Sequence, residues 1–245
     1  MRESDIDAVK RAVRERVWDS LDRTGAVAPP TAHGRIPNFI GAERAANRLA
    51  ELPAWQQADV IKAVPDKAQL PVRALALSDG KLVYMAVPKL AEPEPFYLLD
   101  PANLTVLPME AASSKVAPQV AKRVAIEQLQ PIDLVVCGSV AVNREGARIG
   151  KGAGYSDLEV ALLTEAELIG PDTPIVTTVH DLQVLDGPLP ESEHDFRVDV
   201  IVTPSEVITC GPARRPPGVL WDHLSQSKID AIPVLAARQL KRSLP

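Results

Sequence analysis

The feature that most constrains the fold is a series of short, nearly continuous apolar runs that alternate with segments of helical spacing. The clearest runs are IDLVVCGSVAVN (132–143), PIVTTV (174–179) and VDVIVT (198–203). Short apolar runs rich in β-branched residues are typical of strands that are buried on both faces of a parallel sheet. Because helices alternate with these runs, the chain is predicted to form an α/β fold with a mostly parallel sheet.

The remaining elements follow from apolar spacing and from the Pro and Gly residues that separate periodic segments. A first helix is predicted to end near Thr24-Gly25, with apolar residues at Ile6, Val9, Val13, Val17 and Leu21. Its other face is expected to carry Lys10, Arg11, Arg14 and Arg16. Further helices are expected over 43–51, 71–78, 115–128 and 158–168, and further strands over 59–64, 82–87 and 96–100.

The end of the chain differs from the rest in composition. From residue 211 it is proline-rich and then shows one or two short helical patterns. Residues 1–210 are therefore predicted to form the main α/β domain, and residues 211–245 a linker with a short helical extension that packs on it.

Composition excludes several functional classes. The net charge is −5 and no long basic block occurs, so nucleic acid is not an expected partner. Cys137 and Cys210 have no zinc-ligand or disulfide spacing, which suits a reducing compartment. The charged N-terminus and the lack of a run of about 18 apolar residues predict a soluble, cytoplasmic protein with no membrane partner. The oligomeric state is left open.

The stretch NREGARIGKGAGYSDLE (143–159) is the most unusual part of the sequence. It matches neither the phosphate-binding motif GxxxxGK[ST] nor the dinucleotide-binding motif GxGxxG. Residues 143–146 are sufficient for a hairpin turn, so Gly146 is expected to be structural. A turn does not explain the rest of the stretch, in which Gly150, Gly152 and Gly154 alternate with other residues.

These alternating glycines predict a phosphate-binding loop. Without side chains, the glycines let backbone N–H groups approach an anion, Arg148 and Lys151 add positive charge, and a helix beginning near Tyr155 directs its positive end to the same place. The residues alone leave two roles open for Asp157, which suits either a metal ligand or a stabilising acid in the first turn of the helix. Asp195 is likewise either a metal ligand or an acid in a turn.

The glycine-rich stretch resembles the motif G-x-R-x-G-x-G-x-G-Y-Y-D-R of the 5-formyltetrahydrofolate cyclo-ligase family. The positions that match are Gly146, Arg148, Gly150, Gly152, Gly154, Tyr155 and Asp157. Two further family features recur: Lys10 and Arg14 match a K-x-x-x-R pair in the first helix, and residues 194–199 match H-D-x-x-V-D. The resemblance covers roughly residues 5–208, and the sequence is most similar to a cyclo-ligase-like branch found in plants and as a domain of an animal protein.

This resemblance implies a three-layer α/β/α fold and the ATP- and Mg²⁺-dependent closure of 5-formyltetrahydrofolate to 5,10-methenyltetrahydrofolate. It implies a triphosphate held by Lys10, Arg14, Gly150, Gly152, Ala153 and Gly154, and Mg²⁺ held by Asp157 and Asp195. Arg148, Lys151 and Tyr155 are the implied catalytic residues, and Asp66 with Tyr155 would contact the substrate. The implied partners are ATP and a small molecule such as a reduced folate.

Three departures from the family pattern bear on activity. Ser156 stands where the motif has a second tyrosine, and Leu158 where it has an arginine. Asp66 stands in for the acid of an E-x-x-T segment that helps to bind the pterin. Two functions therefore stay open: an ATP-dependent ligase for a formylated folate or related heterocycle, and a nucleotide- or folate-binding protein that regulates another process without cyclo-ligase activity.

Overall fold

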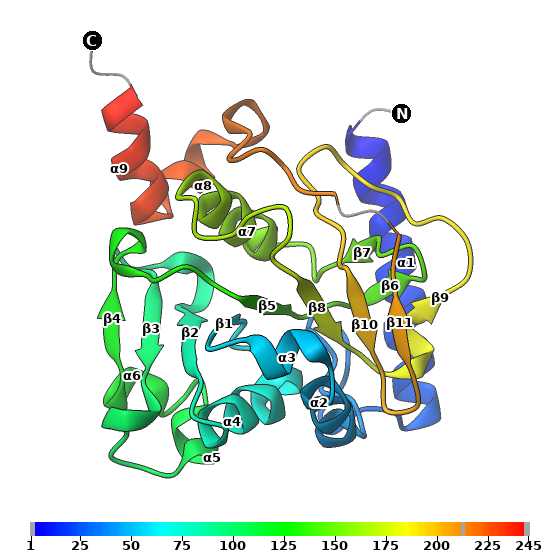
Figure 1. Cartoon of the computed structure of the whole chain (residues 1–245). Helices are drawn as coiled ribbons and strands as arrows, with labels where there is room; N and C mark the ends of the chain where they lie inside the picture. The colour runs from blue at the N-terminus through cyan, green and yellow to red at the C-terminus, as the bar shows by residue number, and fades with distance from the viewer. Residues whose placement is uncertain (1–2, 212–213, 243–245) are drawn as a thin grey trace.

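A computed structural model describes residues 3–211 and 214–242 of the chain. Its centre is an eight-stranded sheet with the order β11-β10-β8-β5-β1-β2-β3-β4 (Figure 1). These strands are β1 (Val60–Ala63), β2 (Leu82–Ala86), β3 (Phe96–Leu99), β4 (Lys122–Val124), β5 (Leu134–Cys137), β8 (Ile175–Thr178), β10 (Val200–Val202) and β11 (Val207–Thr209). A small sheet, β7-β6-β9, joins β6 (Ala141–Asn143), β7 (Arg148–Ile149) and β9 (Val184–Leu185).

The predicted mostly parallel sheet is confirmed. Strands β10, β8, β5, β1 and β2 run parallel, and antiparallel pairing is confined to β11, β3 and β4 at the two edges. Ile61 of β1 lies opposite Val83 on one side and Leu134 on the other. The three apolar runs of the sequence supply the central strands β5, β8 and β10, because such strands are covered on both faces.

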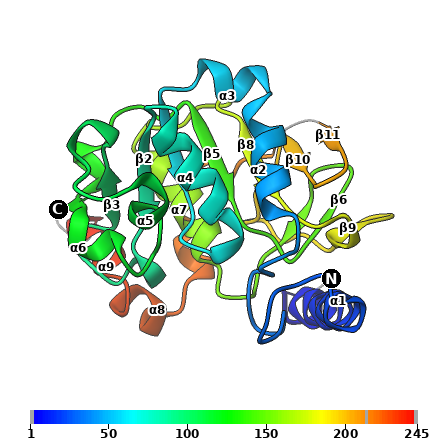
Figure 2. The same cartoon turned by 90° about the horizontal axis from the view of Figure 1, so that it is seen from below.

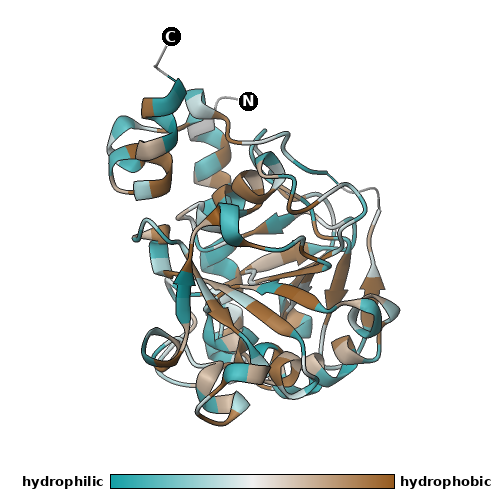
Figure 3. Ribbon diagram, turned by 60° about the vertical axis from the view of Figure 1, so that its left-hand side comes forward, coloured by the Kyte–Doolittle hydropathy of each residue, from teal (hydrophilic) through white to brown (hydrophobic). Residues whose placement is uncertain are grey.

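Helices cover both faces of the sheet, which confirms the three-layer fold (Figure 2). They are α1 (Glu3–Thr24), α2 (Ala42–Ala50), α3 (Pro53–Gln57), α4 (Leu70–Ser78), α5 (Pro108–Ala111), α6 (Ala117–Val120), α7 (Tyr155–Glu165), α8 (Gln226–Asp230) and α9 (Pro233–Arg242). Side chains alternate along each strand. Ile61 of β1 therefore faces a core shared with α2 and α4, whereas Val60 faces a core shared with α7. The central strands are largely brown, that is hydrophobic, in Figure 3.

Helix α1 corrects the predicted assignment of its faces. Val17 and Leu21 are buried as expected, but Val9 is 44% exposed and Lys10 only 5%. Lys10 and Arg14 were expected on the face opposite the apolar residues and instead share a face with Val17 and Leu21, which lie three to eleven residues further along. The N-terminal half of this face meets polar groups of another part of the chain, so cations replace apolar residues there.

The helix predicted over 115–128 is wrong. Only α6 is helical there, and β4 and a 3-10 turn over Ile126–Gln128 follow it. Val124 pairs with Phe96 across the sheet edge, and both are buried. Burial in a strand at the sheet edge therefore prevails over the helical spacing of the valines.

The C-terminal helices pack on the outer side of α7. Ile229, Ile232 and Leu235 are buried in the same core as the apolar side of α7. Arg238 of α9 also forms an ion pair with Glu165, the last residue of α7, at 2.7 Å. The predicted division of the chain near residue 211 stays a prediction. In the part of the chain that the structure describes, no helix has the length and apolar character needed to cross a membrane.

Candidate functional site

The candidate site lies where the chain reverses its direction of travel across the sheet. From β1 the chain moves outward to β2, but β5 lies on the opposite side of β1 and leads on to β8 and β10. The connections after β1 and β5 therefore diverge, which in open α/β sheets leaves a crevice at the carboxyl ends of the strands. A cavity of about 310 Å³ opens there, lined by Val64, Pro65 and Asp66 after β1 and by Gly138 after β5.

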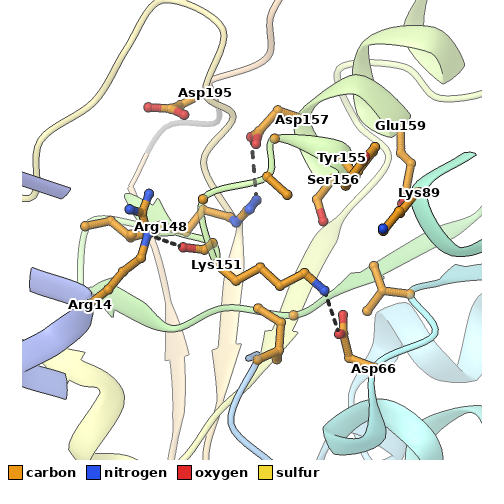
Figure 4. A pocket seen from close by; sticks show the side chains of 18 of the residues that line it. Arg14, Asp66, Lys89, Arg148, Lys151, Tyr155, Ser156, Asp157, Glu159 and Asp195 are labelled. Carbon is orange, nitrogen blue, oxygen red and sulfur yellow. Dashed lines mark hydrogen bonds and ion pairs between the residues drawn. The ribbon is translucent and has the colours of Figure 1, made fainter. Parts of the chain in front are cut away.

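Every residue that was predicted to bind a nucleotide, a metal ion or the substrate lines this one cavity, and Figure 4 labels several of them. They are Lys10, Arg14, Asp66, Arg148, Gly150, Lys151, Gly152, Ala153, Gly154, Tyr155, Asp157 and Asp195. They come from α1, the loop after β1, strand β7, the loop between β7 and α7, the start of α7 and the loop before β10. Their individual roles stay predictions.

The glycine-rich segment forms a hairpin, then a loop, then α7. Gly146 has φ +88° in the β6–β7 turn, and a Cβ atom there would lie 2.2 Å from the carbonyl oxygen of Val198. This agrees with the structural role expected for Gly146. Gly152 and Gly154 also have positive φ, +100° and +67°, which lets the loop bend into the first turn of α7.

The backbone N–H groups of residues 151–157 have no acceptor among the residues that the structure describes. This run covers the loop and the first turn of α7, where helical N–H groups lack intrahelical partners. The positive end of the helix dipole lies at the same place. The segment therefore offers a row of free donors at the edge of the cavity, which is the arrangement that binds phosphate groups.

Arg148 is a buried cation beneath this loop. Its side chain is 4% exposed, and its Cζ atom lies 4.4 Å from the centre of the Phe196 ring. Nη1 is 3.6 Å from Oδ1 of Asp157, yet Nε and Nη1 donate no hydrogen bond to any described residue. Burial lowers the pKa of Arg148, but nearby charges, above all that of Asp157, outweigh it and hold the pKa above its ordinary value. A permanent buried cation with unused donors thus borders the cavity.

Two cations of α1 hold the other side of the loop. Arg14 donates from Nε to the carbonyl oxygen of Gly150 at 2.7 Å. One turn earlier, Lys10 donates to Oδ2 of Asp195 at 2.5 Å and to the hydroxyl of Ser192 at 3.1 Å. The residues that match the family's K-x-x-x-R pair are therefore both at the site, and neither belongs to a solvated helix surface.

Lys151 and Asp66 face each other across the mouth of the cavity (Figure 4). Their side chains form an ion pair at 3.6 Å, and the Lys151 side chain is 44% exposed. Asp66 follows β1 and Lys151 belongs to the glycine-rich loop, so this pair links the two walls. Both residues line the cavity, so a ligand bound there would lie near these two charges.

The two acids predicted to hold a metal ion differ in the hydrogen bonds and ion pairs that they form within the protein. Oδ2 of Asp195 also accepts the backbone N–H of Ser192 at 2.6 Å, so Asp195 orders a turn and balances Lys10. Asp157 accepts no backbone hydrogen bond from any described residue and has only the long contact to Arg148. Of the two, Asp157 is the more available for a cation. Within residues 3–211 and 214–242, no cluster of three or more Asp, Glu, His or Cys residues is arranged to hold a metal ion.

The two residues that depart from the family motif lie on different sides of α7. Ser156 lines the main cavity. Leu158 is buried and lines a second cavity, of about 110 Å³, between α7 and the C-terminal segment. Leu158 therefore does not lie beside a ligand in the main cavity. This departure from the motif was expected to bear on activity, and the position of Leu158 in the second cavity reduces its importance.

Several residues at the site carry no motif in the sequence. Glu159 lines the cavity and forms a buried ion pair with Lys62 of β1, which ties α7 to the sheet. Lys89 also lines the cavity, on a backbone with φ +63°. A non-glycine residue in this conformation is strained, and such strain often accompanies function. An isolated lysine within a strand, such as Lys62, was the only signal that could have revealed the buried pair.

Comparison with known proteins shows the family to which the chain is related. Residues 6–204 match the 5-formyltetrahydrofolate cyclo-ligase family. A methenyltetrahydrofolate synthase domain-containing protein of Mus musculus is 40% identical over 232 residues, covering 92% of this chain and 62% of the mouse protein. The chain thus spans about 60% of the length of the first curated relatives it matches. A mitochondrial 5-formyltetrahydrofolate cyclo-ligase of Arabidopsis thaliana is 34% identical over 86 residues, covering 34% of this chain and 31% of the plant protein.

The fold is also found among solved structures. The 5,10-methenyltetrahydrofolate synthetase of Aquifex aeolicus aligns over 84% of this chain and 95% of its own, with a TM-score of 0.53 and 22% identity. At this identity the likeness shows the fold alone. The family match, by contrast, covers most of the chain and includes the glycine-rich loop and both helix-α1 cations. The chain therefore belongs to the 5-formyltetrahydrofolate cyclo-ligase family.

Proposed function

We propose that the chain binds MgATP in this cavity and uses it to close a carbon–nitrogen bond in a formylated reduced folate or a related heterocycle. The observation that carries the proposal is Arg148, a buried cation whose Nε and Nη1 have no hydrogen-bond partner in the described chain. It lies beneath a row of free backbone N–H groups at the start of α7. An anion with several oxygens, such as a phosphate chain, satisfies both sets of donors.

The charges of the cavity favour MgATP over a bare anion. Three of its cations are already matched by carboxylates, in the pairs Lys10–Asp195, Arg148–Asp157 and Lys151–Asp66. A polyphosphate alone would have to displace these carboxylates and leave them near its own charge. A ligand that contains both an anion and a divalent cation can pair its phosphates with the protein cations and its metal ion with the carboxylates. This supports Mg²⁺ dependence.

The donor set fits Mg²⁺ in a nucleotide site. Mg²⁺ prefers oxygen ligands and is usually held by one or two carboxylates together with phosphates and water. Asp157 would be its main protein ligand, because it is the less engaged of the two predicted acids. When bound, the ion would neutralise charge on the phosphates. Lys10 would meanwhile keep Asp195 and its turn in place.

The proposed reaction depends mainly on how ATP and the substrate are positioned relative to each other. The γ-phosphoryl group passes from ATP to the formyl oxygen of the substrate, and ADP leaves. N10 then attacks the activated carbon, the carbon–oxygen bond breaks with loss of phosphate, and N10 gives up its proton. Such a transfer depends on alignment and on charge neutralisation rather than on a protein nucleophile. Arg148 and Lys151 would balance the phosphoryl charge, and Asp66 with Tyr155 would contact the heterocycle.

The direct test is a screen of purified protein with MgATP and a panel of reduced folates, following ATP turnover and the ultraviolet absorbance of methenyltetrahydrofolate. With 5-formyltetrahydrofolate we expect turnover well below about 1 per second, a typical rate for metabolic enzymes. The reason is Ser156, which leaves the cavity without a second aromatic wall. An aromatic stacking contact contributes about 0.5–1.5 kcal/mol. Ser156→Tyr is therefore expected to raise the rate roughly two- to thirteen-fold.

A matched change outside the cavity controls for this gain. Ser78→Tyr places the same side chain on an exposed position at the end of α4 and should leave the rate unchanged. Ordinary rates in the unmodified chain would show that one aromatic wall is enough. If ATP is not turned over in the presence of any of the folates, other heterocycles should be screened next.

The two acids should respond differently to neutralisation. Asp157→Asn is expected to remove the Mg²⁺ dependence of ATP binding while the apo melting temperature changes little. Asp195→Asn removes the charge that balances buried Lys10, so it should lower the free energy of unfolding by about 1–3 kcal/mol. Calorimetric titration with and without Mg²⁺ and thermal melts of the apo protein measure both effects. A lower apo melting temperature with unchanged metal dependence in Asp157→Asn would assign Asp157 to helix stabilisation instead.

A second candidate function is a nucleotide- or folate-binding protein that regulates another process without catalysis. Two observations favour it: Ser156 in place of an aromatic residue, and the engagement of Asp195 with Lys10 and the Ser192 turn. Binding of MgATP with no turnover in the presence of any folate would support this function over the ligase. The cytoplasmic location and the lack of nucleic-acid and membrane partners stay predictions, and one relative is named as mitochondrial.

A further inference from the structure

The C-terminal segment reaches the glycine-rich loop through one residue, Lys228 of α8. Its Nζ atom donates to the carbonyl oxygen of Ala153 at 2.7 Å and lies 5.4 Å from the centre of the Tyr155 ring. A Cβ atom at Gly154 would come within 3.0 Å of it. Lys228 lies outside residues 6–204, the part of the chain that matches the family.

The segment that carries Lys228 is fixed on α7 by contacts at the C-terminal end of that helix and by a buried residue between them. At its C-terminal end, Glu165 accepts the backbone N–H of Val219 at 2.8 Å and pairs with Arg238. Between these contacts Ile229 is buried in the core next to α7. Figure 1 shows α8 lying beside α7. Lys228 is therefore held in place by contacts independent of the loop.

The contact with Ala153 sets the direction of one peptide unit. Because the peptide is planar and trans, its carbonyl and the following N–H point in opposite directions. Holding the Ala153 oxygen toward α8 turns the Gly154 N–H away from α8. Arg14 holds the Gly150 oxygen in the same way from the other side, at 2.7 Å. Two cations, one near each end of the chain, thus fix two peptide units of the loop.

The surroundings of Lys228 suit this role. Burial lowers the pKa of its ammonium group, and the charge of Asp157 partly opposes that effect. A partly buried cation has lost much of its hydration, so its bond to a carbonyl oxygen is firmer than the same bond in water. Within the described part of the chain, the ammonium group of Lys228 donates its hydrogen bond to the loop.

We propose that residues 214–242 are a working part of the nucleotide site, with Lys228 as a positioning residue that holds the Ala153–Gly154 peptide in its anion-binding orientation. The proposal rests on the proposed binding of MgATP. It adds that a segment beyond the family's shared region determines how well the loop binds phosphate.

The test compares Lys228→Met with Lys228→Arg and with Arg238→Ala in the full chain. Methionine keeps the length of the side chain without its charge, and arginine keeps the cation. Arg238→Ala is the matched control, since it removes a contact of the same segment far from the loop. The first measurement is amide hydrogen exchange of residues 150–157 without nucleotide. Exchange is expected to be about ten-fold faster in Lys228→Met, and unchanged in the other two variants.

The second measurement is calorimetric titration with MgATP. Loss of one charge-assisted hydrogen bond predicts roughly ten-fold weaker binding by Lys228→Met and near-normal binding by the other two variants. Unchanged exchange and affinity in Lys228→Met, or equal losses in Arg238→Ala, would overturn the positioning role. If the unmodified chain binds no MgATP, the proposed function fails, and the exchange measurement still decides whether Lys228 holds the loop.

Discussion

Replacing Arg148 with methionine is expected to weaken MgATP binding by about a hundred-fold or more. Nε and Nη1 of Arg148 are buried and have no partner among the described residues, so both are available to a phosphate oxygen. Each charge-assisted hydrogen bond contributes about 1.5–3 kcal/mol, and two of them correspond to roughly a hundred-fold in affinity at the low end. Methionine retains contact with the Phe196 ring, since sulfur packs well against aromatic rings. Isothermal titration calorimetry measures the loss.

An arginine on the same hairpin serves as the control. Arg144 is exposed and pairs with Glu206 at 2.7 Å, outside the cavity. Arg144→Met should leave MgATP affinity unchanged, because exposed ion pairs contribute little and no ligand contact is removed. Equal affinity in Arg148→Met and the unmodified chain would contradict the phosphate site. A melting temperature close to that of the unmodified chain shows that the variant is folded.

Gly152→Val is expected to lower MgATP affinity by about two orders of magnitude. The φ of +100° at this position strains a β-branched residue, at a cost of roughly 1–3 kcal/mol. The new Cβ atom would also lie 3.2 Å from Cζ of Arg14, which must then shift. This shift of a few tenths of an ångström is expected to weaken the bond from Arg14 to Gly150, a charge-assisted contact of about 1.5–3 kcal/mol when intact. Titration calorimetry with MgATP is again the measurement.

Backbone strain alone must be separated from an effect on the site. Gly80 has φ +78° in the turn after α4, and nothing lies within 4 Å of where its Cβ atom would be. Gly80→Val should therefore lower thermal stability through a similar strain and bind MgATP normally. If both variants lose affinity to the same extent, the loop has no special part in binding.

The elements that the sequence predicted best are those with strong local signals. The apolar runs at β5, β8 and β10 could only be buried strands, and the glycines between β7 and α7 had no adequate explanation as a turn. The mispredicted helix over 115–128 shows the opposite case. Its valines have helical spacing, but pairing of Val124 with Phe96 at the sheet edge determines the structure. Local spacing cannot reveal which partner a segment will find.

The same limit applies to the site. Lys10 and Arg14 were predicted at the site through a motif, although apolar spacing placed them on the helix face opposite the buried residues. Lys228 and the pair Lys62–Glu159 have no motif at all, and their partners lie 75 and 97 residues away in the chain. Asp157 and Asp195 looked alike in sequence and differ only in what the fold places around them. Site residues could thus be predicted where the sequence contains a motif. The contacts that each of them makes in the folded protein could not.

The position of the loop between two ends of the chain has a consequence for folding. Arg14 meets Gly150 across 136 residues, and Lys10 meets Asp195 across 185. Contacts of such sequence separation form slowly, because much chain entropy is lost before they stabilise anything. The central parallel strands can pair before α1 and α8 dock on either side of the loop. We therefore expect the glycine-rich loop to be among the last parts of the molecule to become ordered, and a partly folded chain to lack this arrangement.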